Sequence, residues 1–250
     1  MIPALILGRK GSRGFPGKNT HPVLGRPMSQ YTMLGARHAR SVTHVFLSTD
    51  DELLMELARN NGVEVIVRPP ELCTASALGE DAYQHGYDEI RRRYPREKIE
   101  FVVLLFCNAP TFMPAMIDEG VDILRKKSDI DSAVTACRMN WYSPARARRM
   151  NAAGLLEPFI PFAQFSQGTT INCDRDAQGD CYFTDVCVSV IRPQNLDHLD
   201  QGMLPQKWMG QRIHPIRNIG GLDIDEEWQL PLIEGYLLRN GFTTQTLPYA

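Results

Sequence analysis

"LILGRKGSRGFPGKN", from Leu5 to Asn19, joins an apolar run to a loop that holds four glycines and four cations. The run that ends at Leu7 has the length and composition of a short buried strand. Glycines let backbone N–H groups approach an anion closely, and neighbouring cations neutralise it. Four positive charges match a nucleoside triphosphate better than a phosphate monoester. The stretch therefore predicts a strand followed by a polyphosphate-binding loop.

This loop follows neither of two common phosphate-binding patterns. Its glycines, Gly8, Gly11, Gly14 and Gly17, recur every three residues, which is not the GxGxxG order of a dinucleotide site. No GK[ST] closes the loop, as a Walker A sequence requires. A basic surface turn, flexible because of its glycines, is the alternative, but the position directly after a strand favours binding.

The rest of the chain alternates between short apolar runs and amphipathic stretches. Strands are predicted at 3–7, 44–50, 63–69, 132–138 and 181–193, and a further buried strand followed by a turn is predicted within 100–110. Helices are predicted at 29–40, 51–62, 77–94 and 113–128. This alternation predicts an α/β fold in three layers, with a doubly wound, mostly parallel sheet. Ligands of such sheets bind at the carboxyl ends of the strands. The pattern weakens from about 140 to 180, which indicates an insertion within a single domain spanning 1–250.

Composition restricts the function classes. The 250 residues carry a net charge of −2, so no overall basic field indicates nucleic acid or a membrane surface as partner. The chain has no apolar run of membrane-spanning length and no signal-peptide pattern. Six cysteines form no CxxC pair, which is typical of free thiols in a reducing cytoplasm. A metal or redox use of Cys173 and Cys181 is the alternative, and a cytoplasmic location is expected.

Four ordered motifs resemble one family. The loop R-x-G-S-R-G-x-P-G-K-N at 9–19 is similar to the nucleotide-binding signature of the acylneuraminate cytidylyltransferases, which make CMP-activated sialic acids and related nonulosonic acids. The stretches "LGRPMSQYT" at 24–32, "VFLSTDDELLMELARNNGVEVIVRPPEL" at 45–72 and "GLDIDEEWQLPLIE" at 221–234 also resemble that family. The resemblance implies a nucleotide-diphospho-sugar transferase fold of Rossmann-like type, with a small inserted dimerisation element.

The resemblance also implies roles for individual residues. It assigns Arg68 to the cytosine, together with the backbone near Leu7 and Gly8, and it assigns Asp223 and Asp225 to magnesium or manganese. It places Lys18, Arg9 and Asp223 at the chemical step. The nucleotide-binding set that it implies is Leu7, Gly8, Arg9, Gly11, Ser12, Arg13, Lys18, Asn19 and Arg68.

The acidic pair makes chemical sense as a metal site. Two carboxylates at i and i+2 of an extended segment point to one side and offer hard oxygens to a hard cation. The other interpretation of "DIDEE" is a solvated turn that caps a helix, with Asp225 at the N-cap and Glu227 in the first turn.

The acceptor side departs from the family pattern. Where the family has L-L-Q-P-T-S-P-x-R, this chain has "LLFCNAPTF" at 104–112. Asn108 falls near a position where related Kdo cytidylyltransferases carry a metal-binding aspartate, and it is a candidate substrate-binding residue. Arg175 is the second such candidate. We interpret the departures as a different acceptor sugar.

The sequence therefore predicts an enzyme that transfers CMP from CTP to a 2-keto acid sugar of the sialic, legionaminic or pseudaminic type and releases pyrophosphate. A homodimer is expected, whose partners are CTP and a small acidic sugar. Two alternatives stay open: a nucleotidyltransferase that uses another nucleotide or a sugar phosphate, and a nucleotide-binding homologue without turnover.

Overall fold

A seven-stranded sheet forms the centre of the molecule. The computed structural model describes residues 1–11, 14–164, 171–174 and 176–249. The strand order is β11-β7-β10-β6-β1-β4-β5, and β10 alone runs antiparallel to its neighbours. The strands are β1 (Pro3–Leu7), β4 (His44–Thr49), β5 (Glu64–Val67), β6 (Val102–Phe106), β7 (Ser132–Arg138), β10 (Tyr182–Ile191) and β11 (Ile213–Arg217). The predicted doubly wound, mostly parallel sheet is confirmed.

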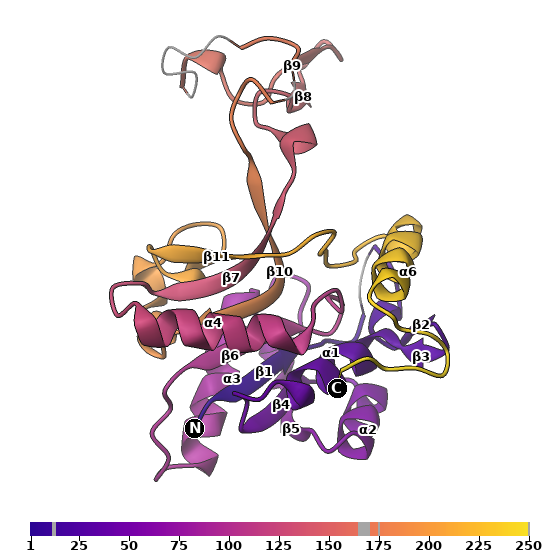
Figure 1. The fold of residues 1–250 in the computed structure, drawn as a ribbon, viewed down its shortest axis with the longest axis vertical. Helices are drawn as coiled ribbons and strands as arrows, with labels where there is room; N and C mark the ends of the chain where they lie inside the picture. The colour runs from indigo at the N-terminus through magenta and orange to yellow at the C-terminus, as the bar shows by residue number, and fades with distance from the viewer. Residues whose placement is uncertain (12–13, 165–170, 175, 250) are drawn as a thin grey trace.

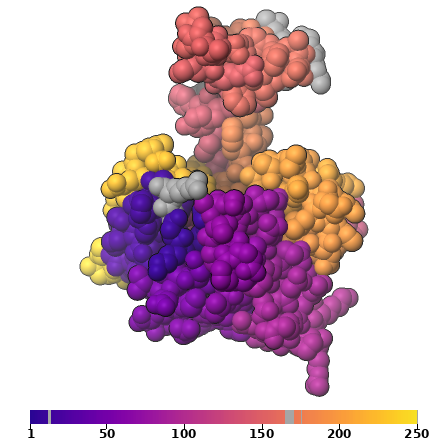
Figure 2. Space-filling model, turned by 180° about the vertical axis from the view of Figure 1, so that it is seen from behind, coloured from indigo at the N-terminus to yellow at the C-terminus, as the bar shows by residue number. Residues whose placement is uncertain are grey.

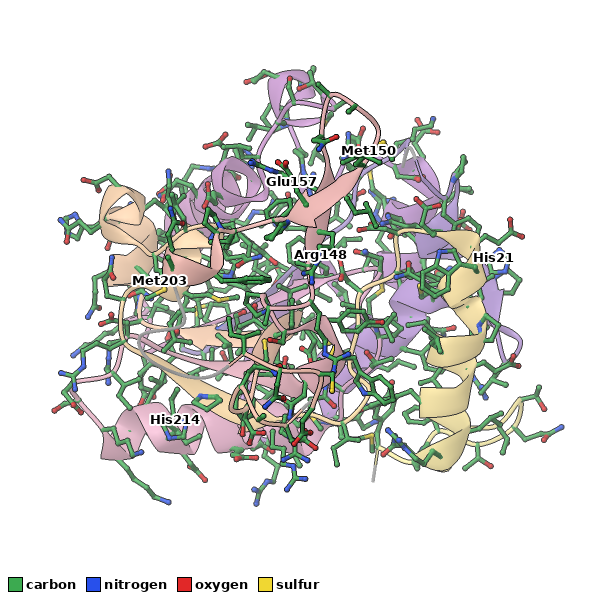
Figure 3. All side chains as sticks on the ribbon, turned by 90° about the horizontal axis from the view of Figure 1, so that it is seen from above. His21, Arg148, Met150, Glu157, Met203 and His214 are labelled. Carbon is green, nitrogen blue, oxygen red and sulfur yellow. The ribbon has the colours of Figure 1, made fainter. Side chains whose placement is uncertain are left out.

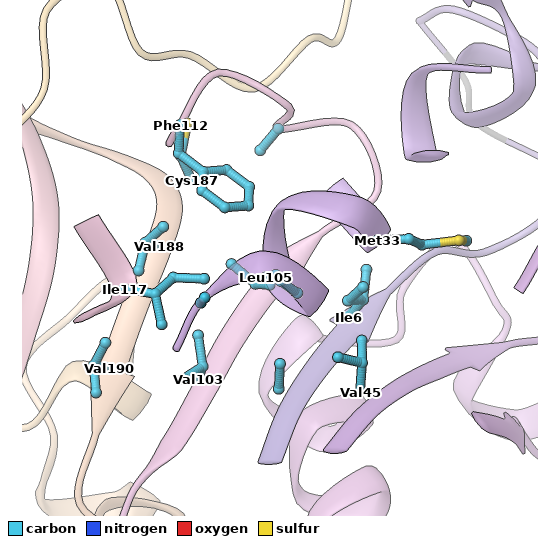
Figure 4. Packing of buried hydrophobic residues seen from close by; sticks show 14 of the residues in the cluster. Ile6, Met33, Val45, Val103, Leu105, Phe112, Ile117, Cys187, Val188 and Val190 are labelled. Atoms are coloured by element: carbon cyan, nitrogen blue, oxygen red, sulfur yellow. The ribbon is translucent and has the colours of Figure 1, made fainter. Parts of the chain in front are cut away.

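Helices cover both faces of this sheet and make three layers (Figure 1). On one face, α1 (Met28–His38), α2 (Glu52–Asn60) and α4 (Pro114–Lys126) pack against strand residues such as Ile6, Val103 and Val190. Figure 4 shows this packing, with Ile117 of α4 among the strand side chains. The other face is covered by α3 (Gly79–Arg93) and α5 (Gln194–Asp197). Successive residues of each strand point to opposite faces of the sheet, so they pack into two separate cores.

The register of the central strands aligns their carboxyl ends. Leu7, the last residue of β1, lies opposite Ser48 of β4 and Phe106 of β6. The segments that follow these strands therefore start at the same edge of the sheet. The glycine loop, by which we mean residues 8–19, is the segment that follows β1.

A third apolar cluster attaches the C-terminal part to the sheet. Helix α6 (Leu230–Arg239) and the hairpin of β2 (Pro22–Val23) and β3 (Arg26–Pro27) pack with α1 around Tyr31, Ile233 and Phe242. Ile224 and Phe15 are buried in the same cluster. Residues 222–226, here called the acidic segment, are thereby held beside the glycine loop.

The described residues between 139 and 181 form an arm that projects from the body. Strands β7 and β10 continue outward to it, and a hairpin of β8 (Arg148–Met150) and β9 (Leu156–Pro158) lies at its far end (Figure 1). Figure 2 shows the narrow neck below this end. Figure 3 looks down on the arm, with Met150 and Glu157 labelled on the hairpin. Large exposed apolar side chains gather on the arm and its base: Trp141, Tyr142, Met150, Leu155, Leu156, Phe159, Tyr182 and Phe183.

The structure refines the predicted elements. The expected helices are present. Helices α2, α3 and α4 begin and end one or two residues inside their predicted ranges, while α1 begins one residue earlier and ends two residues earlier than predicted. Strand β11, helix α6 and the two small hairpins were not among the predicted elements. No helix in the described part of the chain is long and apolar enough to span a membrane.

Candidate functional site

A cavity of about 540 Å³ lies at the carboxyl ends of the central strands. Its walls come from the glycine loop, the ends of β5 and β6, the start of α3, the acidic segment and a loop after β10. The lining residues are Leu7, Gly8, Arg9, Gly14, Lys18, Asn19, Arg68, Leu72, Ala77, Leu78, Gly79, Ala82, Phe106, Asn108, Val186, Gln206, Trp208, Asp223, Asp225 and Glu226. Most of the predicted site residues therefore share one cavity.

Two glycines of the loop are needed for close approach. A Cβ on Gly14 would lie 2.5 Å from the backbone oxygen of Asp225, so only glycine lets the loop touch the acidic segment here. A Cβ on Gly8 would lie 2.5 Å from the Cys107 sulfur, which brings the loop equally close to the turn after β6. The glycine loop thus contacts both other segments that carry predicted site residues.

Lys18 connects the predicted phosphate-binding loop to the predicted metal pair. Its Nζ donates to an Asp225 carboxylate oxygen at 2.6 Å and to the Ile224 carbonyl at 2.7 Å. The lysine side chain is only 12% exposed, so this ammonium is fixed within the cavity wall. Asn19 donates to the Arg9 carbonyl at 3.3 Å, while its own buried Oδ1 has no hydrogen-bond partner in the described part of the chain. Asn19 is itself one of the residues that line the cavity.

The other predicted binding residues differ in whether the structure describes them. Arg9 lines the cavity and donates from Nη1 to the Thr74 carbonyl at 3.1 Å. Gly11 has a φ of +77° and is not part of the cavity lining. Ser12, Arg13 and Arg175 lie outside the described residues, so their predicted roles stay predictions.

Arg68 is a buried cation at the end of β5. It is 6% exposed, and its guanidinium donates from Nη2 to the Ser48 carbonyl at 2.7 Å and from Nε to the Ser48 hydroxyl at 3.3 Å. Burial lowers the pKa of Arg68, while the charge of Asp50 opposes that shift. Burying a guanidinium costs free energy unless its N–H donors are bonded. A buried cation at the wall of a cavity therefore indicates a binding role for Arg68.

Asp223 and Asp225 both line the cavity, on alternate residues of the acidic segment. Burial raises the pKa of Asp223, the neighbouring Asp225 carboxylate raises it further, and Lys18 opposes both effects. Two carboxylates that repel each other beside a cavity fit a divalent cation such as magnesium, which takes one or two carboxylates and completes its shell with waters and phosphates. Within the described residues, no third acidic, histidine or cysteine side chain joins them in a metal-ligating group.

The helix cap in this region belongs to a different residue. Glu226 is the N-cap of the short helix η7 (Glu227–Gln229), and it forms a reciprocal capping box with Gln229. Gln229 also accepts from the backbone N–H of Asp225 at 2.7 Å. The structure thus differs from the alternative in which Asp225 is the N-cap, and the Asp225 carboxylate bonds Lys18 instead.

Asn108 and Thr111 fasten the acidic segment to the turn after β6. The Asn108 amide donates to the Ile224 carbonyl at 2.9 Å, and the Asn108 carbonyl accepts from the Ile224 N–H at 2.9 Å. The Thr111 hydroxyl accepts from the Leu222 N–H at 2.8 Å and donates to the Leu222 carbonyl at 2.9 Å. Asp223 is held between these two anchors. Asn108, which we predicted as a substrate-binding residue, lines the cavity and also positions Asp223.

A buried polar network continues beneath Asp223. The Asp185 carboxyl group accepts from Thr135, from Asn218 at 2.8 Å and from the Cys187 N–H at 3.0 Å. The β10 ladder shifts register between Thr184 and Ser189, and Val186 adopts a φ of +52°, a strained value for a β-branched residue. Asn218 also donates to the Thr111 carbonyl at 2.9 Å, so the bulge of β10 supports the anchor of the acidic segment.

Thiols and imidazoles form no competing site among the described residues. All six cysteines are free, as the sequence predicts, and burial raises the pKa of the Cys107 thiol to about 12. A thiol that stays protonated is a poor nucleophile and a poor metal ligand. Figure 3 shows His21 and His214 on opposite sides of the body. The described cysteines and histidines therefore offer no alternative to the cavity residues for the predicted roles.

Sequence reasoning missed part of the cavity wall. Trp208 and Gln206 come from the segment between β10 and β11, where the sequence "LPQKWMGQ" at 204–211 has no helical or alternating pattern. A lone tryptophan in a polar, irregular stretch was the only available signal. Phe106, which replaces a polar residue of the family pattern, also lines the cavity.

Comparison with known proteins supports the resemblance. Residues 3–84 match the cytidylyltransferase family model. N-acylneuraminate cytidylyltransferase of Oncorhynchus mykiss is 23% identical over 245 residues, 96% of this chain and 51% of that protein. 8-Amino-3,8-dideoxy-manno-octulosonate cytidylyltransferase of Shewanella sp. (strain ANA-3) is 26% identical over 125 residues, 50% of this chain and 48% of that protein. The chain thus spans about half the length of the curated relatives it matches.

Solved structures show the same fold. A CMP:2-keto-3-deoxy-manno-octonic acid synthetase complexed with CTP superimposes with a TM-score of 0.65 at 17% identity, over 96% of this chain and 99% of that one. 4-Diphosphocytidyl-2C-methyl-D-erythritol synthase of Anaerococcus prevotii gives a TM-score of 0.63 at 11% identity, over 95% and 96%. These structures confirm the fold. The resemblance to cytidylyltransferases of the acylneuraminate type, predicted from the motifs, is confirmed by the family model and the curated relatives.

Proposed function

We propose that this protein transfers CMP from CTP to the anomeric hydroxyl of a 2-keto acid sugar and releases pyrophosphate. The observation that carries the proposal is the convergence of three predicted parts on one cavity: the glycine loop, Arg68 and the Asp223/Asp225 pair. The named relatives act on sugars of this class. The 2.6 Å hydrogen bond from Lys18 to Asp225 supports the proposal, because it joins a candidate for phosphate binding to a candidate for metal binding.

The proposed reaction is an in-line displacement. The anomeric oxygen of the sugar forms a bond to the α-phosphorus, the bond from that phosphorus to the β-phosphate oxygen breaks, and pyrophosphate leaves with the electron pair. The hydroxyl proton passes to solvent. Lys18 and Arg9 neutralise charge on the triphosphate, where the transition state spreads it. Arg68 donates to acceptor atoms of the cytosine.

Asp223 and Asp225 are the residues that would hold a divalent cation. Such a cation neutralises phosphate charge and lowers the pKa of a coordinated hydroxyl. The pair is preorganised by this chain, because Asn108 and Thr111 fix the backbone on either side of Asp223. The protein thus supplies the position of the carboxylates before any ligand binds.

The test is pyrophosphate release with CTP, magnesium and a panel of 2-keto acid sugars, with sugar phosphates as a second panel. Turnover of a keto acid sugar is the expected result. Turnover of a sugar phosphate alone would favour the other nucleotidyltransferase alternative. Tight CTP binding without any turnover would favour a binding protein.

Nucleotide choice is tested separately by calorimetric titration. We expect CTP to bind more tightly than ATP, GTP or UTP, because the buried Arg68 and the backbone near Leu7 and Gly8, which the resemblance assigns to the cytosine, line the same cavity. Equal or tighter binding of a purine nucleotide would contradict the cytidylyl assignment.

A further inference from the structure

The glycine loop leaves the sheet along the end of β4. The Gly8 N–H donates to the Ser48 carbonyl at 3.2 Å, which extends the parallel pairing of Leu7 with Ser48 by one bond. If the ladder continued two residues further, the Lys10 N–H would donate to the Asp50 carbonyl. It donates instead to the Asp50 side chain, with 2.8 Å between the amide nitrogen and Oδ1. The carboxylate thus takes the place of the next backbone acceptor.

This bond holds a part of the loop that has little stiffness of its own. Gly8 and Gly11 flank Lys10 closely, and Gly11 has a φ of +77°. Glycine loses more conformational freedom on ordering than any other residue. A loop that binds an anion through its backbone N–H groups loses affinity if it must become ordered only when the ligand arrives. Asp50 anchors the loop on the side of β4, as Lys18 does on the side of the acidic segment.

The same end of β4 also holds Arg68. The Ser48 carbonyl that accepts from the Gly8 N–H accepts from the Arg68 guanidinium as well, at 2.7 Å. Burial lowers the pKa of Arg68, and the negative charge of Asp50 opposes that shift, so the two charges interact. Arg68 in turn balances the charge of Asp50, which would otherwise repel a triphosphate at the loop. A carboxylate is therefore tolerated beside an anion site.

We propose that Asp50 is a positioning residue for the triphosphate: its side-chain oxygen holds the Lys10 N–H, and through it the glycine loop, in the conformation that binds the phosphates. Asp50 is not among the described residues that line the cavity, so it acts through the loop and does not touch the ligand. This inference rests on the proposed function for the identity of the nucleotide. The bond itself serves any triphosphate that the loop binds.

A pair of variants, Asp50→Ala and Asp50→Asn, tests the hydrogen bond. Both remove the same charge, but the asparagine keeps an acceptor oxygen for the Lys10 N–H. The difference between them therefore reports the acceptor alone. The dissociation constants of CTP and of inorganic triphosphate, measured by calorimetric titration, should be about five- to tenfold higher in Asp50→Ala than in Asp50→Asn, the equivalent of one hydrogen bond. Asp50→Asn should stay near the wild type.

The neighbouring carboxylate provides a matched control for loss of structure. Asp51 is the N-cap of α2 and accepts from the Leu53 N–H at 3.0 Å, so Asp51→Ala also removes one bond between a carboxylate and a backbone N–H. Thermal melting should show a loss of stability in both alanine variants. Only Asp50→Ala should bind triphosphate more weakly, and in steady-state assays it should raise the KM for CTP and leave the KM for the acceptor sugar unchanged.

Three results would overturn the inference: equal triphosphate affinities in Asp50→Ala and Asp50→Asn, an equal loss of affinity in Asp51→Ala and Asp50→Ala, or a wild type that binds neither CTP nor inorganic triphosphate. The binding measurements need no sugar and no turnover. Failure of the wild type to turn over any keto acid sugar, with the expected difference between the two Asp50 variants still present, would therefore overturn the proposed function alone.

Discussion

Asp223 combines an expected functional role with an unfavourable environment. It is partly buried, faces the Asp225 carboxylate and is compensated only in part by Lys18. The burial and the neighbouring negative charge that disfavour the charged form of this carboxyl in the free protein also favour the binding of a cation, because a cation would neutralise that charge. Residues of this kind are commonly retained at a cost in stability.

We predict that Asp223→Asn or Asp225→Asn lowers turnover by about 100-fold or more, because each change removes a charge that stabilises the transition state. Each substitution keeps nearly the same volume, so the fold should be retained. The measurement is pyrophosphate release as a function of magnesium concentration, with thermal melting as the control. Near-normal rates and an unchanged magnesium midpoint in both variants would place the metal elsewhere.

Asp223→Asn should also stabilise the protein at neutral pH. Because the pKa of Asp223 is raised on folding, the folded state favours the protonated carboxyl, and stability is lost as the pH rises through that pKa. The neutral amide avoids this loss. In denaturant unfolding without divalent cations, the gain should be present at pH 7 and shrink towards pH 4, near the ordinary carboxyl pKa. A gain that does not depend on pH would point to packing instead.

Single residues could be predicted from the sequence where a motif fixed their spacing. The glycine loop, Arg68 and the two aspartates were found in this way, and the structure brings the described ones to one cavity, except Gly11. Trp208 and Thr111 could not be found, because their importance comes from partners far away in the chain. Thr111 bonds Leu222, and only the fold shows that contact.

At the scale of elements, the acidic segment depends on the turn after β6. The Thr111 hydroxyl bonds both the N–H and the carbonyl of Leu222. Asn108 bonds Ile224 at the same two groups, with its side-chain amide on the carbonyl and its own backbone carbonyl on the N–H. Since Asp223 lies between Leu222 and Ile224, its position follows from these bonds. Loss of one anchor should therefore change catalysis without touching a ligand.

We predict that Thr111→Val lowers turnover about tenfold and the free energy of unfolding by about 1–3 kcal/mol, because the Leu222 N–H loses its acceptor in a partly buried place. Assays of pyrophosphate release measure the change in turnover, and chemical denaturation measures the change in the free energy of unfolding. Thr43→Val is a matched control: its hydroxyl makes the same pair of bonds, to the N–H and carbonyl of Ile2, away from the cavity. Equal losses of turnover in the two variants would refute a positioning role for Thr111.

Periodicity predicted the elements that are long and regular. The strand at 132–138 matches β7 residue for residue. Strand β11 was not predicted, because its sequence, "IHPIR", contains a proline and does not alternate; an edge strand tolerates both. The antiparallel direction of β10 could not be predicted either, because direction depends on the path of the arm and leaves no mark on the strand's own residues.

For the whole molecule, the arm is the feature that a single subunit does not explain. Its exposed apolar side chains include Trp141 at 68% and Leu156 at 71%, far more than a solvated hairpin needs. Aromatic and apolar residues mixed with arginines are typical of a protein interface. The predicted role of residues 140–180 as a dimerisation element stays a prediction, and the structure supplies the surface for it.

We predict a homodimer in solution, with a mass near twice the 28.2 kDa of the chain, measured by light scattering. Leu156→Asp, at the end of the arm, should weaken the dimer because it buries a charge in an apolar contact. Leu53→Asp is the control, since Leu53 is exposed to a similar degree, 64%, on α2 of the body. A fully active monomeric wild type would exclude the arm as an obligatory interface.

The neck of the arm has a consequence for chain entropy. Arg138 at the end of β7 lies opposite Tyr182 at the start of β10, so the residues between them form a loop whose two ends are already held together. The entropy lost in closing such a loop grows only with the logarithm of its length, about 0.6 kcal/mol for each doubling. Insertions and deletions beyond the neck thus cost the body little folding free energy. The arm can change its length and surface while the register of the sheet, and the cavity at its edge, remain the same.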